Sequence, residues 1–193
     1  MRTPWLLVVA TGAIAAAILM TTTGAGAVEA AAPVAEQASA EIATALPAAR
    51  LRGRGTLRYF GLTIYEARLW AAPDFAPGQY DAHALALELR YARALDGAAI
   101  AQRSIDEMRR VGAFDESRAK AWLAQLTQAI PDVKPGDRLT GVRVPGGATR
   151  FFSNGQPIAA IADPEFGRLF FGIWLSTNTS EPALRRELIG AAS

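Results

Sequence analysis

A run of nine residues near the middle of the chain alternates strictly between two sets of side chains. His83, Leu85, Leu87, Leu89 and Tyr91 alternate with Ala84, Ala86, Glu88 and Arg90. Successive side chains of a strand point to opposite faces, so this run predicts a strand with one buried and one partly wet face. Residues 96–111 instead repeat their apolar side chains at helical spacing. The chain must therefore combine a half-buried sheet with amphipathic helices.

The order of the other elements favours an antiparallel sheet. Residues 50–72 predict a hairpin with its tight turn at Phe60-Gly61, and Asn154-Gly155 predicts a second turn. Asp96 and Asp115 are predicted N-caps of two helices, and Pro131 ends the second of them. The further predicted segments are helices 96–111, 115–130, a helix opening at Asp163-Pro164, and 181–189, with strands 138–144, 148–152 and 156–161. Strands joined by short turns are antiparallel, so the predicted fold class is α+β rather than doubly wound.

The first segment predicts export. Residues 1–27 contain one Arg, an apolar run from Trp5 to Met20 and a small-residue ending at Ala27, the pattern of a cleaved signal peptide. The run is shorter than the roughly 20 residues that span a bilayer. We expect cleavage after Ala27 and a periplasmic or secreted protein without a stable membrane anchor; the alternative is an uncleaved N-terminal anchor. Most of the Ala-rich residues 28–47 predict a tether or a weakly ordered first turn, and residues 48–190 predict the folded domain.

Composition excludes several classes of site. The chain has no Cys and a single His, His83, so thiolate chemistry, lipidation of an N-terminal Cys and multi-His metal sites are excluded. The formal net charge is only +2, and no concentrated basic stripe predicts nucleic-acid binding. No motif predicts a cofactor or a metal, and the oligomeric state is not predicted.

One polar cluster is predicted in the first hairpin. A turn at Phe60-Gly61 places Arg58 opposite Thr63, with Tyr65 diagonally on the same face. A guanidinium beside two hydroxyls suits a carboxylate or an enolate. The alternatives are that Arg58 pairs with Glu66, Glu88 or Asp106 or lies at the rim, and that a register slip scatters the cluster.

Nine motifs in order resemble the bacterial chalcone isomerase-like family. They are Gly53–Arg58, Phe60–Leu62, Ile64–Trp70, Leu89–Tyr91, Pro131–Asp137, Phe152–Gly155, Asp163–Phe166, Phe171–Leu175 and Leu184–Gly190. The resemblance implies an open-faced β-sandwich, in which a large antiparallel sheet has helices packed on one side and a ligand cleft lies between them.

The resemblance also implies roles for individual residues. By motif position, Arg58 is the arginine that receives the negatively charged ligand group in this family, and Tyr65 corresponds to the hydroxyl residue of its fatty-acid binders. Thr63 is a weaker candidate. The tyrosine and asparagine that contact substrate in the isomerases correspond here to Ile100 and Glu107, so chalcone cyclisation is not expected.

Three functions remain open on the sequence alone. The first is a non-catalytic exported protein that binds a fatty acid or a similar apolar carboxylate through Arg58, Tyr65 and Thr63. The second is an isomerase or lyase acting on an enolate, with Arg58 as the electrophilic stabiliser and Tyr65 as the acid. The third is an envelope interaction module whose cleft is filled by its own side chains.

Overall fold

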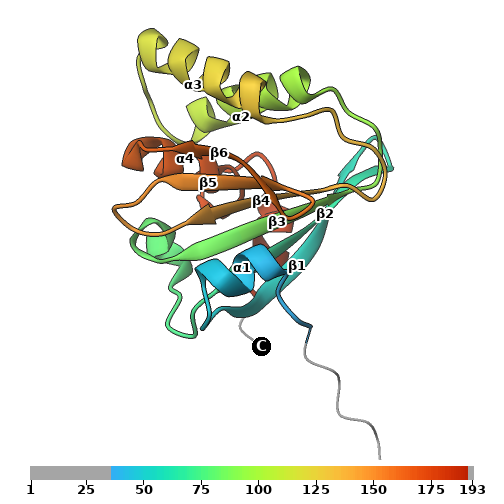
Figure 1. Ribbon diagram of the computed structural model, residues 1–193, viewed down its shortest axis with the longest axis vertical. Helices are drawn as coiled ribbons and strands as arrows, with labels where there is room; N and C mark the ends of the chain where they lie inside the picture. The colour runs from blue at the N-terminus through green and yellow to red at the C-terminus, as the bar shows by residue number, and fades with distance from the viewer. Residues whose placement is uncertain (1–35, 191–193) are drawn as a thin grey trace, which may run out of the picture. The chain divides into compact units, whose positions relative to one another are not determined.

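A six-stranded antiparallel sheet forms the centre of the fold (Figure 1). The computed structural model describes residues 36–190. The strands lie in chain order, so every neighbour in the sheet is also the neighbour in sequence. They are β1 (Arg50–Tyr59), β2 (Leu62–Ala71), β3 (Leu85–Tyr91), β4 (Arg138–Arg143), β5 (Thr149–Ser153) and β6 (Gln156–Ile161). The predicted α+β class with an antiparallel sheet is confirmed.

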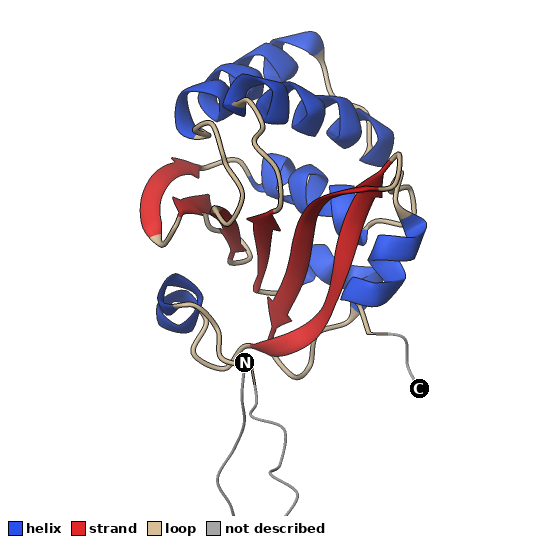
Figure 2. Ribbon diagram, turned by 90° about the vertical axis from the view of Figure 1, so that its right-hand side faces the viewer, coloured by secondary structure: helices blue, strands red, loops and turns tan. Residues whose placement is uncertain are grey.

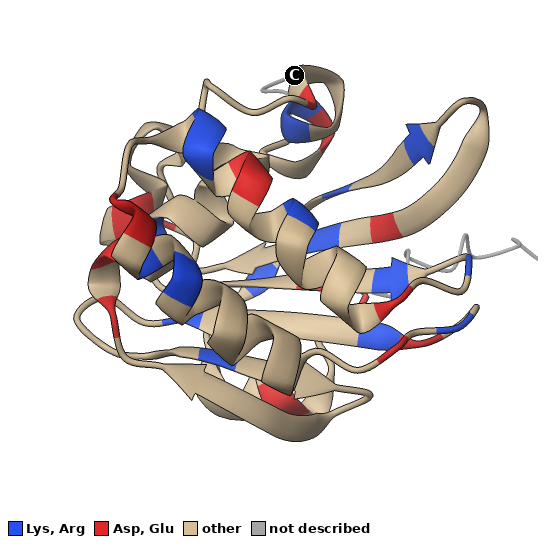
Figure 3. Ribbon diagram, turned by 90° about the horizontal axis from the view of Figure 1, so that it is seen from above, with Lys and Arg blue, Asp and Glu red and all other residues tan. Residues whose placement is uncertain are grey.

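Two turns fix the register of the hairpins. Phe60 and Gly61 have φ values of 47° and 77°, and Asn154 and Gly155 have 49° and 85°. Two successive residues with positive φ match the right-handed twist of the flanking strands, which is why such turns join hairpins. Both predicted turns are therefore confirmed. The β1–β2 tip extends well beyond the neighbouring strands in Figure 3.

Four helices follow the predicted pattern on one face of the sheet. They are α2 (Gly97–Val111), α3 (Glu116–Ala129), α4 (Pro164–Leu175) and α5 (Pro182–Leu188), and a short 3-10 helix, η1 (Pro77–Ala82), contacts α4. Asp96 accepts a hydrogen bond from Ala99 N at 2.7 Å, and Asp115 accepts one from Arg118 N at 2.8 Å. These side chains satisfy backbone donors that have no partner inside the helix, so both predicted N-caps are confirmed.

The main core lies between the sheet and these helices. Leu85, Leu87 and Leu89 of the alternating strand all face it, whereas Ala86 faces the other side. On α4, Phe166 and Phe170 stack at 5.4 Å between ring centroids. In Figure 2 the strands lie between the α2–α3 pair and one short helix on the far side. Within residues 36–190, no helix has the length and apolar character required to cross a membrane.

That short helix, α1 (Ala40–Ala45), corrects the predicted tether. Its Ile42 is fully buried against Trp70, Ala86 and Val142 on the outer face of the sheet. Residues 40–45 therefore belong to the folded unit, which begins at Glu36. The predicted signal peptide and residues 28–35 lie outside the described residues.

A buried carboxylate attaches α1 to the sheet. Glu41 Oε1 accepts hydrogen bonds from Arg138 Nη2 and from Thr140 Oγ1, both at 3.0 Å. Burial raises the pKa of Glu41, but hydrogen bonds from its own backbone N–H and from Thr140, together with the charge of Arg138, outweigh burial and hold the pKa below 4.5. The ionised form is therefore the one that the fold stabilises.

We predict that Glu41→Gln lowers the free energy of unfolding at pH 7 by about 1–3 kcal/mol, because Arg138 loses a buried charged partner. Because the folded-state pKa of Glu41 is depressed, this stabilisation is complete above the unfolded pKa and disappears as the pH falls through the folded pKa. Urea unfolding across a pH series should therefore show wild type and variant converging below pH 4.5. The exposed Asp74→Asn is the control, and a constant difference at all pH values would contradict the prediction.

Two glycines of β1 let α5 lie directly against the strand. A Cβ on Gly53 would overlap the carbonyl oxygens of Glu187 and Leu188, and a Cβ on Gly55 would overlap the side chains of Leu184 and Glu187. The Gly-x-Gly spacing of this strand therefore has a packing explanation, because the two glycines leave room for α5 to pack directly against β1.

We predict that Gly53→Ala lowers the free energy of unfolding by about 1–3 kcal/mol, because the added methyl meets backbone that cannot move aside. Gly78→Ala is the matched control, since a Cβ there meets nothing within 4 Å and its φ is not positive. Thermal or urea unfolding of the two variants measures the difference. Equal stabilities would show that α5 shifts freely on β1.

Candidate functional site

An apolar cavity lies between the sheet and the helices. Its volume is about 280 Å³, close to the lower end of the roughly 300–1,000 Å³ of small-molecule sites. Aliphatic and aromatic side chains from the strands of the sheet and from α2 and α4 make up most of its wall. They include Leu57, Leu87, Leu89, Leu95, Phe151 and Phe170. The cavity is therefore suited to an apolar ligand.

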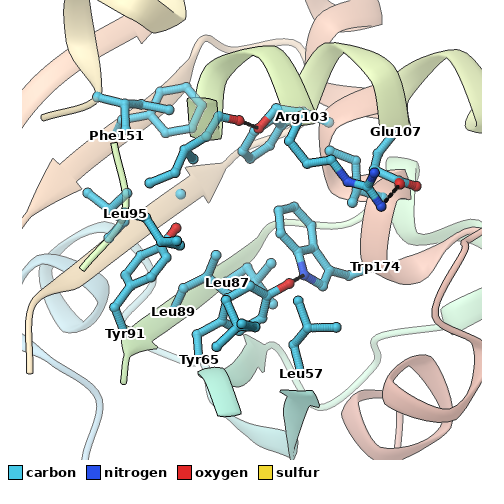
Figure 4. A pocket seen from close by; sticks show the side chains of 18 of the residues that line it. Leu57, Tyr65, Leu87, Leu89, Tyr91, Leu95, Arg103, Glu107, Phe151 and Trp174 are labelled. Carbon is cyan, nitrogen blue, oxygen red and sulfur yellow. Dashed lines mark hydrogen bonds and ion pairs between the residues drawn. The ribbon is translucent and has the colours of Figure 1, made fainter. Parts of the chain in front are cut away.

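A tyrosine hydroxyl lies at one side of this cavity. Tyr65 Oη accepts a hydrogen bond from Trp174 Nε1 at 3.0 Å (Figure 4). Burial is the main cause that raises the pKa of Tyr65, and the charges of Glu181 and Glu107 raise it further. The phenol therefore stays protonated at neutral pH. Because its oxygen accepts from Trp174, its own O–H remains available, among the described residues, to donate to a ligand.

An ion pair on α2 lies on the same side. Arg103 Nη2 is 2.6 Å from Glu107 Oε1, and the arginine side chain is 66% exposed whereas the glutamate is 6% exposed. Figure 4 shows this pair and the Tyr65–Trp174 bond together, with Leu95 and Phe151 across the cavity. The hydroxyl of Tyr91 lies beside Leu95 in the same view, so the cavity has a mostly apolar wall with a few separate polar groups, as an amphipathic ligand requires.

The structure separates the three residues predicted to form one cluster. Arg58 lies opposite Thr63, as predicted, but the next pair along the hairpin is Leu57 with Tyr65. Between these two pairs the chain advances by one residue on β1 and by two residues on β2, so Ile64 forms a β-bulge. Because of this extra residue, Tyr65 points to the opposite face from Thr63. Tyr65 lines the apolar cavity, whereas Arg58 and Thr63 line a polar groove on the outer face. The prediction that Arg58, Thr63 and Tyr65 form a single cluster is therefore wrong.

The outer groove is a different chemical environment. Thr56, Glu66 and Arg90 line it together with Arg58 and Thr63. The guanidinium of Arg58 is exposed, and no carboxylate among residues 36–190 forms an ion pair with it. Its predicted internal partners thus do not hold it: Glu66 and Glu88 both pair with Arg68 instead, and Asp106 accepts a hydrogen bond from Gln102.

Two residues that the resemblance singled out do face the cavity. Ile100 and Glu107 both line it from α2, and Arg103 lies between them on the same helix face. From the sequence, Ile100 and Glu107 are expected only as replacements of the substrate-contacting residues, and Arg103 is not predicted to line the site. The spacing of three and four residues along one helix was the signal available for it. Within residues 36–190 no group of three acidic or histidine side chains is placed to hold a metal ion.

Comparison with known proteins agrees with this architecture. A model of the chalcone isomerase-like family matches residues 35–190. The chain belongs to the chalcone isomerase-like family. Among solved structures, a crystal structure of a fatty-acid binding protein of Arabidopsis thaliana is similar, with a TM-score of 0.58 and 10% identity over 74% of this chain and 87% of that chain. At this identity the likeness shows the shared fold. No curated protein sequence matches the chain.

We predict that Tyr65→Phe lowers the free energy of unfolding by about 1–3 kcal/mol, because it leaves the largely buried indole N–H of Trp174 without its acceptor. Urea unfolding followed by tryptophan fluorescence measures this change. Tyr59→Phe removes an exposed hydroxyl at the hairpin tip and should leave stability unchanged. Two variants with equal stability would mean that water replaces the tyrosine oxygen at no cost.

Proposed function

We propose that the protein is an exported, non-catalytic binding protein for a fatty acid or a similar apolar carboxylate. The observation that carries the proposal is the unfilled, mostly apolar cavity with a few polar groups in its wall. The fold shared with a fatty-acid binding protein supports the same ligand class. A cleft filled by its own side chains was the expectation for an interaction module, and the cavity is not filled in this way.

The two ends of such a ligand contribute differently to its binding in the cavity. Burial of the tail contributes about 0.8 kcal/mol per CH₂ group, so the tail supplies most of the affinity. The carboxylate accepts a hydrogen bond from Tyr65 Oη and one from the guanidinium of Arg103. A charged hydrogen bond of this kind contributes about 1.5–3 kcal/mol. The head group therefore fixes the orientation of the ligand.

Glu107 competes for the same guanidinium. Its buried carboxylate contacts Arg103, whose exposed position leaves it free to turn toward a ligand. A bound carboxylate must share or take over this arginine, and Glu107 repels it. Removing the charge of Glu107 and removing the charge of Arg103 should therefore change the affinity in opposite directions.

We predict that Arg103→Gln weakens fatty-acid binding about tenfold or more, whereas Glu107→Gln strengthens it. Calorimetric titration of the lipid-stripped protein with a series of saturated fatty acids measures both effects. Affinity should rise about fourfold per added methylene until the cavity is filled. Arg150→Gln, which removes an exposed arginine of β5, is the matched control.

Two results would contradict this assignment. If Arg58→Gln abolishes binding and Arg103→Gln does not, the carboxylate lies in the outer groove with Arg58 and Thr63. If no fatty acid of any length binds, and mass spectrometry finds no acid that co-purifies with the protein, the proposed ligand class is wrong.

A further inference from the structure

The tip of the first hairpin exposes three large apolar side chains. Phe60 is 87% exposed, Tyr59 62% and Leu62 51%, and Val144 at 38% is the remaining exposed large apolar side chain among residues 36–190. The tip carries no charged residue between Tyr59 and Thr63, and Figure 3 shows it extending beyond the other strands. Apolar exposure in the described part of the chain is thus concentrated on one projecting loop.

Exposed arginines surround the base of this tip. Arg58 precedes it, and Arg58 and Arg90 line the same outer groove. Arg93 follows Ala92, whose backbone N–H donates to the carbonyl of Ile64 in β2. Within residues 36–190 no carboxylate forms an ion pair with any of these three arginines. The one acidic side chain in the groove, Glu66, contacts Arg68 at 2.7 Å.

The same hairpin forms part of the cavity wall. Leu57 and Ile64, which lie two residues from the tip on its two strands, both line the cavity. The apolar tip and part of the cavity wall therefore belong to the same hairpin, with Arg58 and Thr63 between them.

We propose that this hairpin tip inserts into the interfacial region of an anionic lipid bilayer, with the arginines at its base contacting lipid phosphates. Aromatic side chains with one polar end, such as Tyr59, are favoured at the membrane–water interface. A basic residue near an anionic surface adds a further attraction that salt screens. The contact goes beyond ligand binding and does not require it.

The shape of the tip favours a bilayer over a folded protein partner. A projecting loop with two adjacent aromatic rings, 4.5 Å apart between centroids, needs a matching groove in a protein partner. A bilayer needs none, because lipid chains rearrange around the inserted rings. The positive charge around the tip complements anionic headgroups. Both features are those of a reversible peripheral contact rather than of a spanning segment.

The absence of cysteine from the sequence allows one label to report insertion. Phe60→Cys carrying a nitrobenzoxadiazole group is mixed with vesicles of phosphatidylcholine alone or of equal parts phosphatidylcholine and phosphatidylglycerol. Val144→Cys with the same label is the matched control. We expect the label at position 60 to shift to shorter wavelength and brighten severalfold on the mixed vesicles, and the label at 144 to stay unchanged. No change at position 60, or equal changes at both positions, would overturn the proposal.

Unlabelled variants test the forces separately. Phe60→Asn, which tolerates the positive φ of this turn, should lower the vesicle partition coefficient about tenfold. Arg58→Gln and Arg90→Gln should each lower it about fivefold on the mixed vesicles and not on phosphatidylcholine. All proteins carry the same N-terminus, verified by mass spectrometry, and unfolding experiments check that each folds.

Two outcomes separate this contact from other roles of the tip. Fatty-acid binding in solution by Phe60→Asn should equal that of wild type, so a failure of the membrane contact leaves the proposed ligand binding intact. If light scattering shows a wild-type dimer that Phe60→Asn dissociates, while vesicles bind both proteins equally, the tip contacts a second copy and the proposal is overturned.

Discussion

The β-bulge at Ile64 determines what each face of the first hairpin can do. With a regular ladder, Thr63 and Tyr65 would share a face, and Arg58 would accompany Tyr65 into the cavity. A guanidinium there, with one phenol as its partner, would cost several kcal/mol in desolvation. The extra residue turns Arg58 and Thr63 outward and lets Ile64 and Tyr65 both line the cavity. The cavity wall remains apolar, and the arginine remains in water.

The fold was predictable because local signals agree along most of the chain. Alternation identified β3, positive-φ turn residues identified both hairpins, and Asp96 and Asp115 marked where helices begin. The helix α1 was not predictable in this way, because six residues are too few to show a helical periodicity. Its position also depends on contacts from Glu41 to residues almost a hundred positions away. Such contacts are set by tertiary packing and leave no periodicity in the sequence.

The site was only partly predictable, and the reason is again geometric. Tyr65 was expected on a strand of the first hairpin and lies on β2, but it does not share a face with Arg58. A bulge has no reliable sequence signal when the inserted residue is an ordinary isoleucine. Arg103 was not predicted to line the site, because an arginine and a glutamate four residues apart are typical of a solvated helix face. The pair differs from a surface pair in that Glu107 is buried against the cavity while Arg103 is exposed.

This asymmetry has a consequence for how the cavity treats an anion. Of the charged side chains that line it, two are acidic, Glu107 and Glu181, and one is basic, Arg103. An anion without an apolar tail gains little there, because it must compete with Glu107 for the one guanidinium and has nothing else to bury. A long tail reverses the balance, because roughly eight buried methylenes contribute about 6 kcal/mol, more than one charged hydrogen bond supplies. Under the proposed function, the cavity would therefore select first for apolar length and only then for the head group, and small carboxylates would bind weakly without any steric gate.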